Sequence, residues 1–238
     1  MRKILRVGCV CFGVIALALA GGLAWAYFDT RDLPDTESLA QFAPARKMAV
    51  FDPCRHASSV AVPYEMIGGN LRAAVGAAEA SENGPGVIRA TYRSFSATRE
   101  LNAVSLSMRI ARSAVCSPAE HLDREARQLR FALQLERRFS QRELFTILAN
   151  RLVFDGDNDG IESASQRFFH KEPDQLALGE SALIAGLARR PFGDSPVTHP
   201  DRAISRRNQI LDAMAQEGLI SRAQASEAKS APLGVVGE

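Results

Sequence analysis

Residues 117–150 read SPAEHLDREARQLRFALQLERRFSQRELFTILAN, and this stretch contains two helix starts. Ser117-Pro118-Ala119-Glu120 combines an N-cap serine, a proline at the first helical position and a glutamate that can reach back to the cap. Ser140-Gln141-Arg142-Glu143 repeats the capping-box pattern. The stretch therefore predicts two consecutive helices, the second of which continues through Leu144 and Leu148.

Helical signals continue on both sides of this stretch. Residues 70–80 are rich in Ala and Leu, and residues 176–187 are so apolar that they predict a helix buried on most of its sides. Residues 206–216 predict a further helix, and Ser221 begins a capping box for a last short one. Residues 47–51 predict one short strand. The predicted fold class is therefore mainly α.

The helix predicted from Ser117 has an apolar side and a basic side. Leu129, Ala132 and Leu133 share one face at helical spacing. Other faces of the same helix suit its arginines, which are Arg127, Arg130, Arg137 and Arg138. This division is typical of a helix that packs on a core with one side and meets solvent with another.

The N-terminus predicts a single-pass anchor in the inner membrane. Residues 7–28 are uncharged, and their length is close to the ~20 residues with which a helix crosses a bilayer. Arg2, Lys3 and Arg6 precede them, a charge bias that puts the N-terminus in the cytoplasm and the domain in the periplasm. A cleaved signal peptide stays open as the alternative, because Ala24-Trp25-Ala26 has the small-x-small form of a processing site. Both interpretations export the domain.

The rest of the chain has the size and composition of one domain. We predict residues 1–28 as the anchor or signal peptide, 29–46 as a linker and 47–238 as the domain. Over the full chain, 29 basic residues are almost balanced by 27 acidic ones, for a formal net charge of +2, and no long basic run is present. This balance argues against nucleic acid as a partner.

Two further features of the sequence leave alternatives open. Cys54 and Cys116 lie in the exported part, where an oxidising compartment allows either a disulfide between them or two free thiols. Residues 155–160 read DGDNDG, which resembles the start of a calcium loop, but the twelfth position is Gln166 rather than glutamate. A solvated acidic turn at Asp155–Asp159 is the preferred interpretation, and no metal ligands are assigned.

The order of several motifs resembles glycosyltransferase family 51, the domain of class A penicillin-binding proteins and monofunctional peptidoglycan glycosyltransferases. The motifs, within residues 33–232, are Ala132–Arg137, Phe139-Ser140, Asn150-Arg151, Gly160–Glu162, Phe168–Lys171, Glu180–Leu187 and Arg206–Leu211. The resemblance implies a lysozyme-like helical domain that acts on lipid-linked disaccharide-peptide units. In that family one carboxylate deprotonates the acceptor hydroxyl, and cations with a divalent metal, Mg or Mn, stabilise the leaving pyrophosphate.

The family's first motif aligns Glu79 with the catalytic base. The aspartate that follows the base in the family is Ala80 here, and the link onward to Arg89 is shorter than the family's pattern. A base misplaced by about 1 Å can lose roughly 100-fold in rate. Glu79 is therefore either the general base or a solvated carboxylate at a helix end.

The second and fourth motifs supply candidates for binding substrate phosphate. Arg112 matches a cation that the family directs at phosphate, and Arg109 is an added charge at a position where the family has glutamine. A solvated basic helix face is the alternative for both. Asn150 is the polar residue that the fourth motif retains, while its lysine, glutamate and tyrosine are replaced.

The third motif departs most from the family. It aligns with residues 124–128, in which Arg124 keeps a phosphate-binding cation, the lysine is Glu125 and the second catalytic carboxylate is Gln128. Glutamine carries no charge and cannot accept a proton in the required range. Shifting the register to make Glu125 or Glu120 the acid is disfavoured, because the match resumes at Ala132 without a gap.

Three functions are predicted, and whether the chain is an enzyme stays open. The favoured one is a degenerate relative with lost or weakened activity that binds wall-synthesis proteins, glycan strand or lipid-linked precursor. The second is an active polymerase with Glu79 as base, Arg112 and Arg124 on phosphate, and Mg or Mn. The third is an unrelated envelope protein. We favour the first because helix-packing residues match the family, whereas substrate-facing residues are replaced.

Overall fold

The computed structural model of the chain describes residues 21–22, 33–52, 57–81, 101–115, 121–154, 160–188 and 195–236. The helices are α2 (Thr36–Ala40), α3 (Gly69–Ser81), α5 (Leu101–Ala114), α6 (His121–Arg138), α7 (Gln141–Asn150), α8 (Gly160–Phe169), α9 (Leu178–Leu187), α10 (Pro200–Gln216) and α11 (Arg222–Ser230), with a 3-10 turn, η2, at Tyr64–Met66. An antiparallel hairpin joins β1 (Met48–Asp52) to β2 (Ala57–Ala61), with Met48 opposite Ala61. The mainly α fold class is confirmed.

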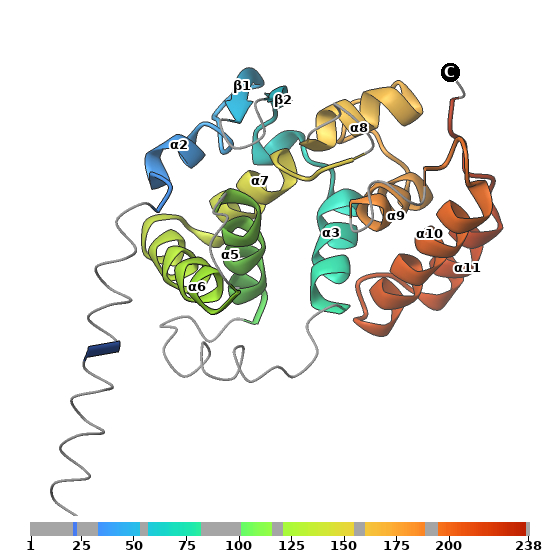
Figure 1. Ribbon diagram of the computed structural model, residues 1–238. Helices are drawn as coiled ribbons and strands as arrows, with labels where there is room; N and C mark the ends of the chain where they lie inside the picture. The colour runs from blue at the N-terminus through green and yellow to red at the C-terminus, as the bar shows by residue number, and fades with distance from the viewer. Residues whose placement is uncertain are drawn as a thin grey trace, which may run out of the picture.

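Helix α3 lies in the middle of the domain. It packs against α9 and α10 on one side and α5 on the other, and Figure 1 shows the α5, α6 and α7 group separated by it from α9, α10 and α11. Leu71, Ala74 and Ala77 of α3 are fully buried. Small side chains allow these neighbouring helices to approach closely, which is how an Ala-rich helix becomes central.

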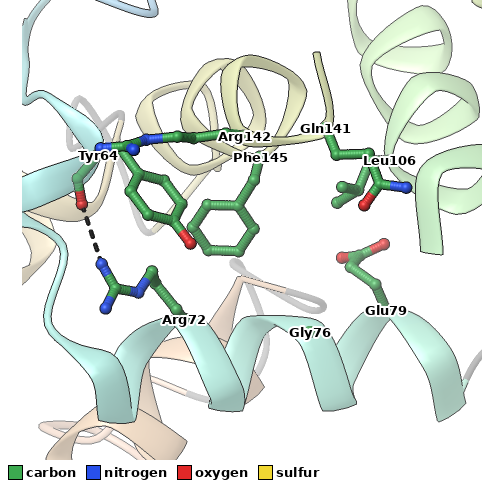
Figure 2. A pocket seen from close by; sticks show the side chains of 8 residues that line it. All are labelled: Tyr64, Arg72, Gly76, Glu79, Leu106, Gln141, Arg142 and Phe145. Carbon is green, nitrogen blue, oxygen red and sulfur yellow. Dashed lines mark hydrogen bonds between the residues drawn. The ribbon is translucent and has the colours of Figure 1, made fainter. Parts of the chain in front are cut away.

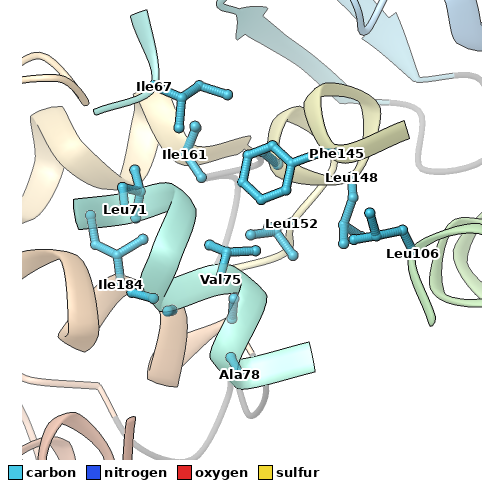
Figure 3. Close-up of a cluster of buried hydrophobic side chains, with 14 of the residues drawn as sticks. Ile67, Leu71, Val75, Ala78, Leu106, Phe145, Leu148, Leu152, Ile161 and Ile184 are labelled. Carbon is cyan, nitrogen blue, oxygen red and sulfur yellow. The ribbon is translucent and has the colours of Figure 1, made fainter. Parts of the chain in front are cut away.

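The core joins side chains of α3 to those of three elements around it. Figure 3 shows Val75 of α3 with Phe145 and Leu148 of α7, Ile161 of α8 and Ile184 of α9. All are buried, and their removal from water is the main stabilising contribution of such a cluster. The residues at one end of this core also form one wall of the pocket described below.

The local helix signals are largely confirmed. The hydroxyl of Ser140 accepts a hydrogen bond from the Glu143 backbone N–H, while the Glu143 carboxylate accepts from the Ser140 N–H. Ser221 caps α11 in the same way. Helix α9 is buried throughout residues 181–187, as predicted. Helix α10 was predicted from Arg206 but begins at Pro200, because proline suits the first turn, where its missing N–H costs nothing.

Three parts of the structure differ from the sequence predictions. The single strand predicted at residues 47–51 has a partner, β2, so a hairpin replaces it. Residues 33–46, predicted within a linker, include α2, and Leu39 and Phe42 are buried in the core. The resemblance seen in the sequence also aligned residues 102–105 with a turn before the second motif's helix, but α5 begins at Leu101, so these residues are helical.

Several predictions lie outside the described residues. They concern the Ser117 cap, Cys54, Cys116, the acidic turn at Asp155–Asp159 and all of the apolar segment 7–28 except residues 21–22. In the parts of the chain that the structure describes, every helix is too short or too polar to cross a bilayer.

Candidate functional site

A pocket of about 390 Å³ opens beside α3. Its floor is one face of that helix, made by Arg72, Gly76 and Glu79, which are four and three residues apart and therefore share a side. The other walls come from η2, α5 and α7 and are formed by Tyr64, Leu106, Gln141, Arg142 and Phe145. Figure 2 shows Glu79 and Arg72 at opposite ends of the pocket.

The acidic end of the pocket holds Glu79. Only 6% of this residue is exposed, and its Oε1 lies 3.2 Å from Nη1 of Arg109, whose side chain is 24% exposed. Arg109 also donates from Nη2 to the backbone carbonyl of Ala188, at 3.1 Å. The structure thus gives both residues a role that the sequence did not predict: Glu79 is a buried partner of Arg109, and Arg109 links α5 to α3 and to the end of α9.

The opposite end of the pocket is cationic and aromatic. The guanidinium carbons of Arg72 and Arg142 lie 4.6 and 4.4 Å from the ring centroid of Tyr64. Arg72 donates to the Tyr64 carbonyl at 3.4 Å, and Arg142 forms an ion pair with Glu65. Tyr64 in turn meets Phe145 edge to face, with ring centroids 5.9 Å apart. These residues were not predicted, although the spacing of Arg72 to Glu79 on one helix face could have indicated the first of them.

Most of the other predicted site residues lie elsewhere. Arg112 on α5 and Arg124 on α6 are exposed, and Gln128 is half-buried on α6. None of the three is among the described residues that line the pocket. The structure therefore brings Glu79 and Arg109 together but does not bring the two remaining phosphate candidates or the replaced acid to the same pocket.

Asn150 has a different role from the phosphate contact that the resemblance implied. It is fully buried, and its Oδ1 accepts from the Val62 N–H at 3.0 Å. Its Nδ2 donates to the carbonyls of Val62 and Phe42, both at 2.8 Å. Because the amide is fully occupied by backbone groups and shielded from water, Asn150 ties α7 to two other segments of the core instead of contacting substrate.

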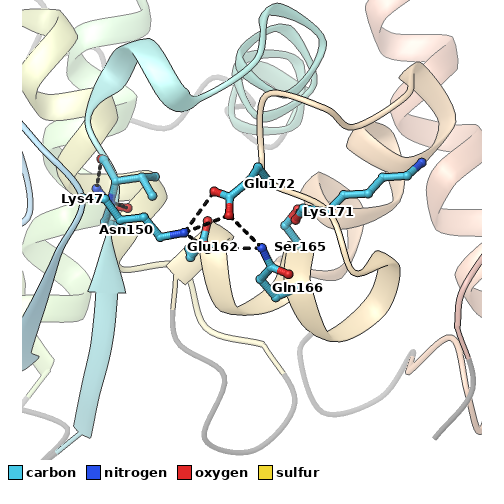
Figure 4. Close-up of polar contacts among 8 residues, drawn as sticks. Lys47, Asn150, Glu162, Ser165, Gln166, Lys171 and Glu172 are labelled. Atoms are coloured by element: carbon cyan, nitrogen blue, oxygen red, sulfur yellow. Dashed lines mark hydrogen bonds and ion pairs between the residues drawn. The ribbon is translucent and has the colours of Figure 1, made fainter.

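A second buried glutamate lies outside the pocket. Glu162 of α8 is 4% exposed, and its Oε1 accepts from Lys47 Nζ at 2.5 Å (Figure 4). Lys47 also donates to both carboxylate oxygens of Glu172, at 3.0 Å. The hydrogen bond to Glu162, opposed by partial burial and supported by Glu172, raises the pKa of Lys47. This network joins Lys47, the residue just before β1, to α8 and to the loop after α8.

The residues around the pocket do not fit a protein-held divalent metal. Among the residues that the structure describes, Glu79 is the only carboxylate that lines the pocket, and it is paired with Arg109. Across the described segments, no three His, Cys, Asp or Glu side chains gather closely enough to hold an ion. The described residues therefore offer magnesium or manganese no ligand set from which a catalytic step could be derived.

Known proteins are similar in sequence to this chain over most of the domain. A family model described as transglycosylase matches residues 48–215. Penicillin-binding protein 1A of Aquifex aeolicus is 31% identical over 150 residues, which are 63% of this chain and 21% of that protein. Penicillin-binding protein 1C of Escherichia coli is 36% identical over 148 residues, 62% of this chain and 19% of that protein. The chain thus spans about a fifth of these relatives' length.

A solved structure gives a weaker match. The crystal structure of penicillin-binding protein 1A from Haemophilus influenzae is 22% identical and covers 58% of this chain and 17% of that one. Its TM-score is 0.37.

Proposed function

Since this chain belongs to the transglycosylase family, we propose that it binds lipid-linked peptidoglycan precursor in the bacterial envelope without polymerising it. The family match over residues 48–215 excludes the hypothesis of an unrelated envelope protein. The proposal includes the lysozyme-like form of the domain, its anchoring in the inner membrane by residues 7–28 and its position among wall-synthesis proteins in the periplasm.

The single observation that carries this proposal is the ion pair between Glu79 and Arg109. A general base must have an oxygen free to take the proton of the acceptor hydroxyl. Oε1 of Glu79 instead lies 3.2 Å from a guanidinium, in a site where Glu79 is only 6% exposed. Exclusion of water strengthens such a pair, so opening it costs more than it would on the surface. One of the two carboxylate oxygens of Glu79 is thus engaged in an ion pair, from which we infer that this carboxylate has a structural role.

The missing second carboxylate supports the same conclusion. The position that aligns with it is Gln128, which is neutral and half-buried, and none of the described side chains of its helix, α6, lines the pocket. Glutamine can hydrogen-bond but cannot supply the negative charge that the family's reaction uses at that place. Glycan polymerisation thus lacks one carboxylate, and the other is engaged.

Precursor binding is supported by the cationic end of the pocket. Arg72 and Arg142 present two guanidiniums beside the ring of Tyr64, and arginine forms paired hydrogen bonds with phosphate oxygens. Arg72 precedes Glu79 by seven residues, which is about 10 Å along a helix. A sugar unit could lie between them, over Phe145, with its phosphate at the arginine end.

One observation favours the alternative of an active polymerase. Glu79 lines the pocket, so its side chain is at a place that a bound ligand can reach. Activity would require Arg109 to release this carboxylate when substrate binds, and another group to replace Gln128. A glycan-chain assay that compares the native protein with Glu79→Gln separates the two functions.

Binding can be measured with the full-length protein in detergent and a fluorescent lipid-linked precursor. We expect the native protein to bind, and Arg72→Gln and Arg142→Gln each to weaken binding about tenfold, the usual scale of a charge-assisted hydrogen bond. Arg222→Gln, an exposed change on α11, is the matched control and should leave the affinity unchanged. The proposal fails if the native protein does not bind, or if both pocket variants bind as tightly as the control.

A further inference from the structure

Gly76 leaves the middle of the pocket open. It lies inside α3 and lines the pocket between Arg72 and Glu79. Apart from its own helix, no described atom comes within 4 Å of a Cβ built on this residue, so the space above it is open. Glycine is less favourable than alanine inside a helix, and alanine would fit here without a clash. The glycine therefore weakens the helix slightly and adds volume to the pocket.

The walls around this open space combine apolar side chains with one hydroxyl. Leu106 and Phe145 are apolar, and the ring of Tyr64 meets Phe145 edge to face. Figure 2 shows the hydroxyl of Tyr64 pointing away from its backbone, toward Phe145 and α3. Within the described parts of the chain, Tyr64 interacts through its ring and its backbone carbonyl, and its hydroxyl makes no hydrogen bond. This hydroxyl can therefore donate to a ligand or accept from one.

The charged side chains that line the pocket lie at its two ends. Arg72 and Arg142 are at one end and Glu79 is at the other, as Figure 2 shows, with Gly76 between them on the floor. The volume of about 390 Å³ is near the lower end of the usual range for small-molecule sites, about 300–1,000 Å³. The pocket is therefore sized for one part of a large ligand, and its middle suits a part that carries no charge.

We propose that the middle of the pocket is a subsite for a saccharide ring and that Gly76 and Tyr64 determine this specificity. A sugar ring has apolar C–H faces and hydroxyl groups around its edge, which match apolar walls and one phenolic hydroxyl. Gly76 lets the ring approach the backbone of α3, and Tyr64 forms a hydrogen bond with a hydroxyl of the ring. This inference rests on the proposed function, since the sugar is that of the lipid-linked precursor. It adds that two uncharged residues recognise the sugar.

The test compares two fluorescent ligands on the full-length protein in detergent. One is the lipid-linked precursor, and the other is polyprenyl pyrophosphate, which keeps the lipid and the phosphates but has no sugar. The affinity for both is measured with the native protein, Gly76→Leu, Gly76→Ala and Tyr64→Phe. Ala223→Leu is the matched control, because Ala223 is exposed on α11 and the same side chain is added there outside the pocket. Thermal unfolding of each variant checks its fold.

We expect Gly76→Leu to weaken precursor binding about thirtyfold, the usual scale of overpacking, and Tyr64→Phe to weaken it about fivefold, the scale of one uncharged hydrogen bond. Gly76→Ala adds less volume and should have a smaller effect. None of these changes should affect the binding of polyprenyl pyrophosphate, and Ala223→Leu should affect neither ligand. Leucine and alanine favour a helix more than glycine does, so neither variant of Gly76 should unfold at a lower temperature than the native protein.

The failure of this inference can be distinguished from the failure of the proposed function. If the native protein binds the precursor and the variants of Gly76 and Tyr64 bind it equally well, the inference is wrong and precursor binding stands. The same holds if Gly76→Leu loses both ligands equally, or if the native protein binds the two ligands with equal affinity, because the sugar is then not recognised. A native protein that does not bind the precursor would overturn the proposed function and this inference with it.

Discussion

Glu79 on α3 and Glu162 on α8 are both almost fully buried and both paired with a cation, but they differ in what surrounds them. Glu162 is held by Lys47 and shares that partner with Glu172, in a contact that joins the residue just before β1 to α8. Glu79 is held by Arg109 and lines a pocket. A buried carboxylate that matches a family motif therefore indicates chemistry only when a ligand can reach it. The scaffold around α7 and α8 and the pocket beside α3 should respond differently to substitution.

The largest effect is expected for Asn150→Ala in the scaffold. The change removes three buried hydrogen bonds and leaves backbone groups of Val62 and Phe42 without their partner. The free energy of unfolding should fall by about 3–5 kcal/mol, as measured by urea denaturation. Asn70→Ala is the control, because Asn70 is exposed and makes one long hydrogen bond of 3.4 Å. A loss below about 1 kcal/mol for Asn150→Ala would show that its amide does not join these segments.

Two glycine substitutions should have opposite signs in the two regions. Gly160 begins α8 with φ of +83°, and a Cβ there would lie 2.9 Å from the Asn150 carbonyl oxygen. Gly160→Ala should therefore destabilise the protein by about 2 kcal/mol. Gly76 lies inside α3 with no atom within 4 Å of an added Cβ, so Gly76→Ala should stabilise it by about 0.5–1 kcal/mol. Thermal unfolding of both variants checks the difference, and equal signs would contradict it.

The Lys47 network should give a smaller effect that depends on pH. Lys47→Met leaves Glu162 buried without its cation, and we expect a loss of about 1 kcal/mol at neutral pH, because Lys47 itself is 35% exposed. The folded protein raises the pKa of Lys47 above its ordinary value of 10.5. The stabilisation is therefore complete below pH 10.5 and is lost as the pH rises through the raised pKa. Urea midpoints of both proteins should converge at alkaline pH, and a constant gap would contradict this.

The smallest effect is expected for the two arginines that the sequence predicted as phosphate contacts and that are exposed to solvent in the structure. Arg112 and Arg124 are exposed and do not line the pocket. Replacing each with glutamine should change the free energy of unfolding by less than about 0.5 kcal/mol and leave precursor affinity within about twofold. A tenfold loss of affinity in either variant would show that the ligand extends beyond the pocket, toward the family's usual phosphate positions.

Signals within a few residues of one another predicted the helices well. Features that depend on pairing between separate segments of the chain were missed. The capping boxes at Ser140 and Ser221 are readable because all their partners lie within three residues. Strand β2 was missed because residues 57–61, ASSVA, are mostly small Ala and Ser, with Val60 as the one β-branched residue. Pairing with β1 makes them a strand. Pro200 was interpreted as the end of a segment, although proline equally suits the beginning of a helix.

The site was predictable only in part. Glu79 was identified by its motif, and Arg109 was noted as an added charge, but the two are 30 residues apart and meet only through the packing of α3 on α5. Asn150 matched a motif as well, and nothing in its local sequence showed that its amide is enclosed by Val62 and Phe42. The position of each residue in a motif identified it as a candidate. Its role depends on its burial and its partners, which only the tertiary fold shows.

The central claim is that the scaffold of the family is present while its chemistry is disabled at Glu79. The most direct measurement is a glycan-chain assay with the purified full-length protein, lipid-linked precursor and divalent metal, run on the native protein and on Glu79→Gln. We expect no polymer from either protein, with precursor bound by the native one. Polymer that forms with the native protein and disappears in Glu79→Gln would contradict the claim and establish an active polymerase.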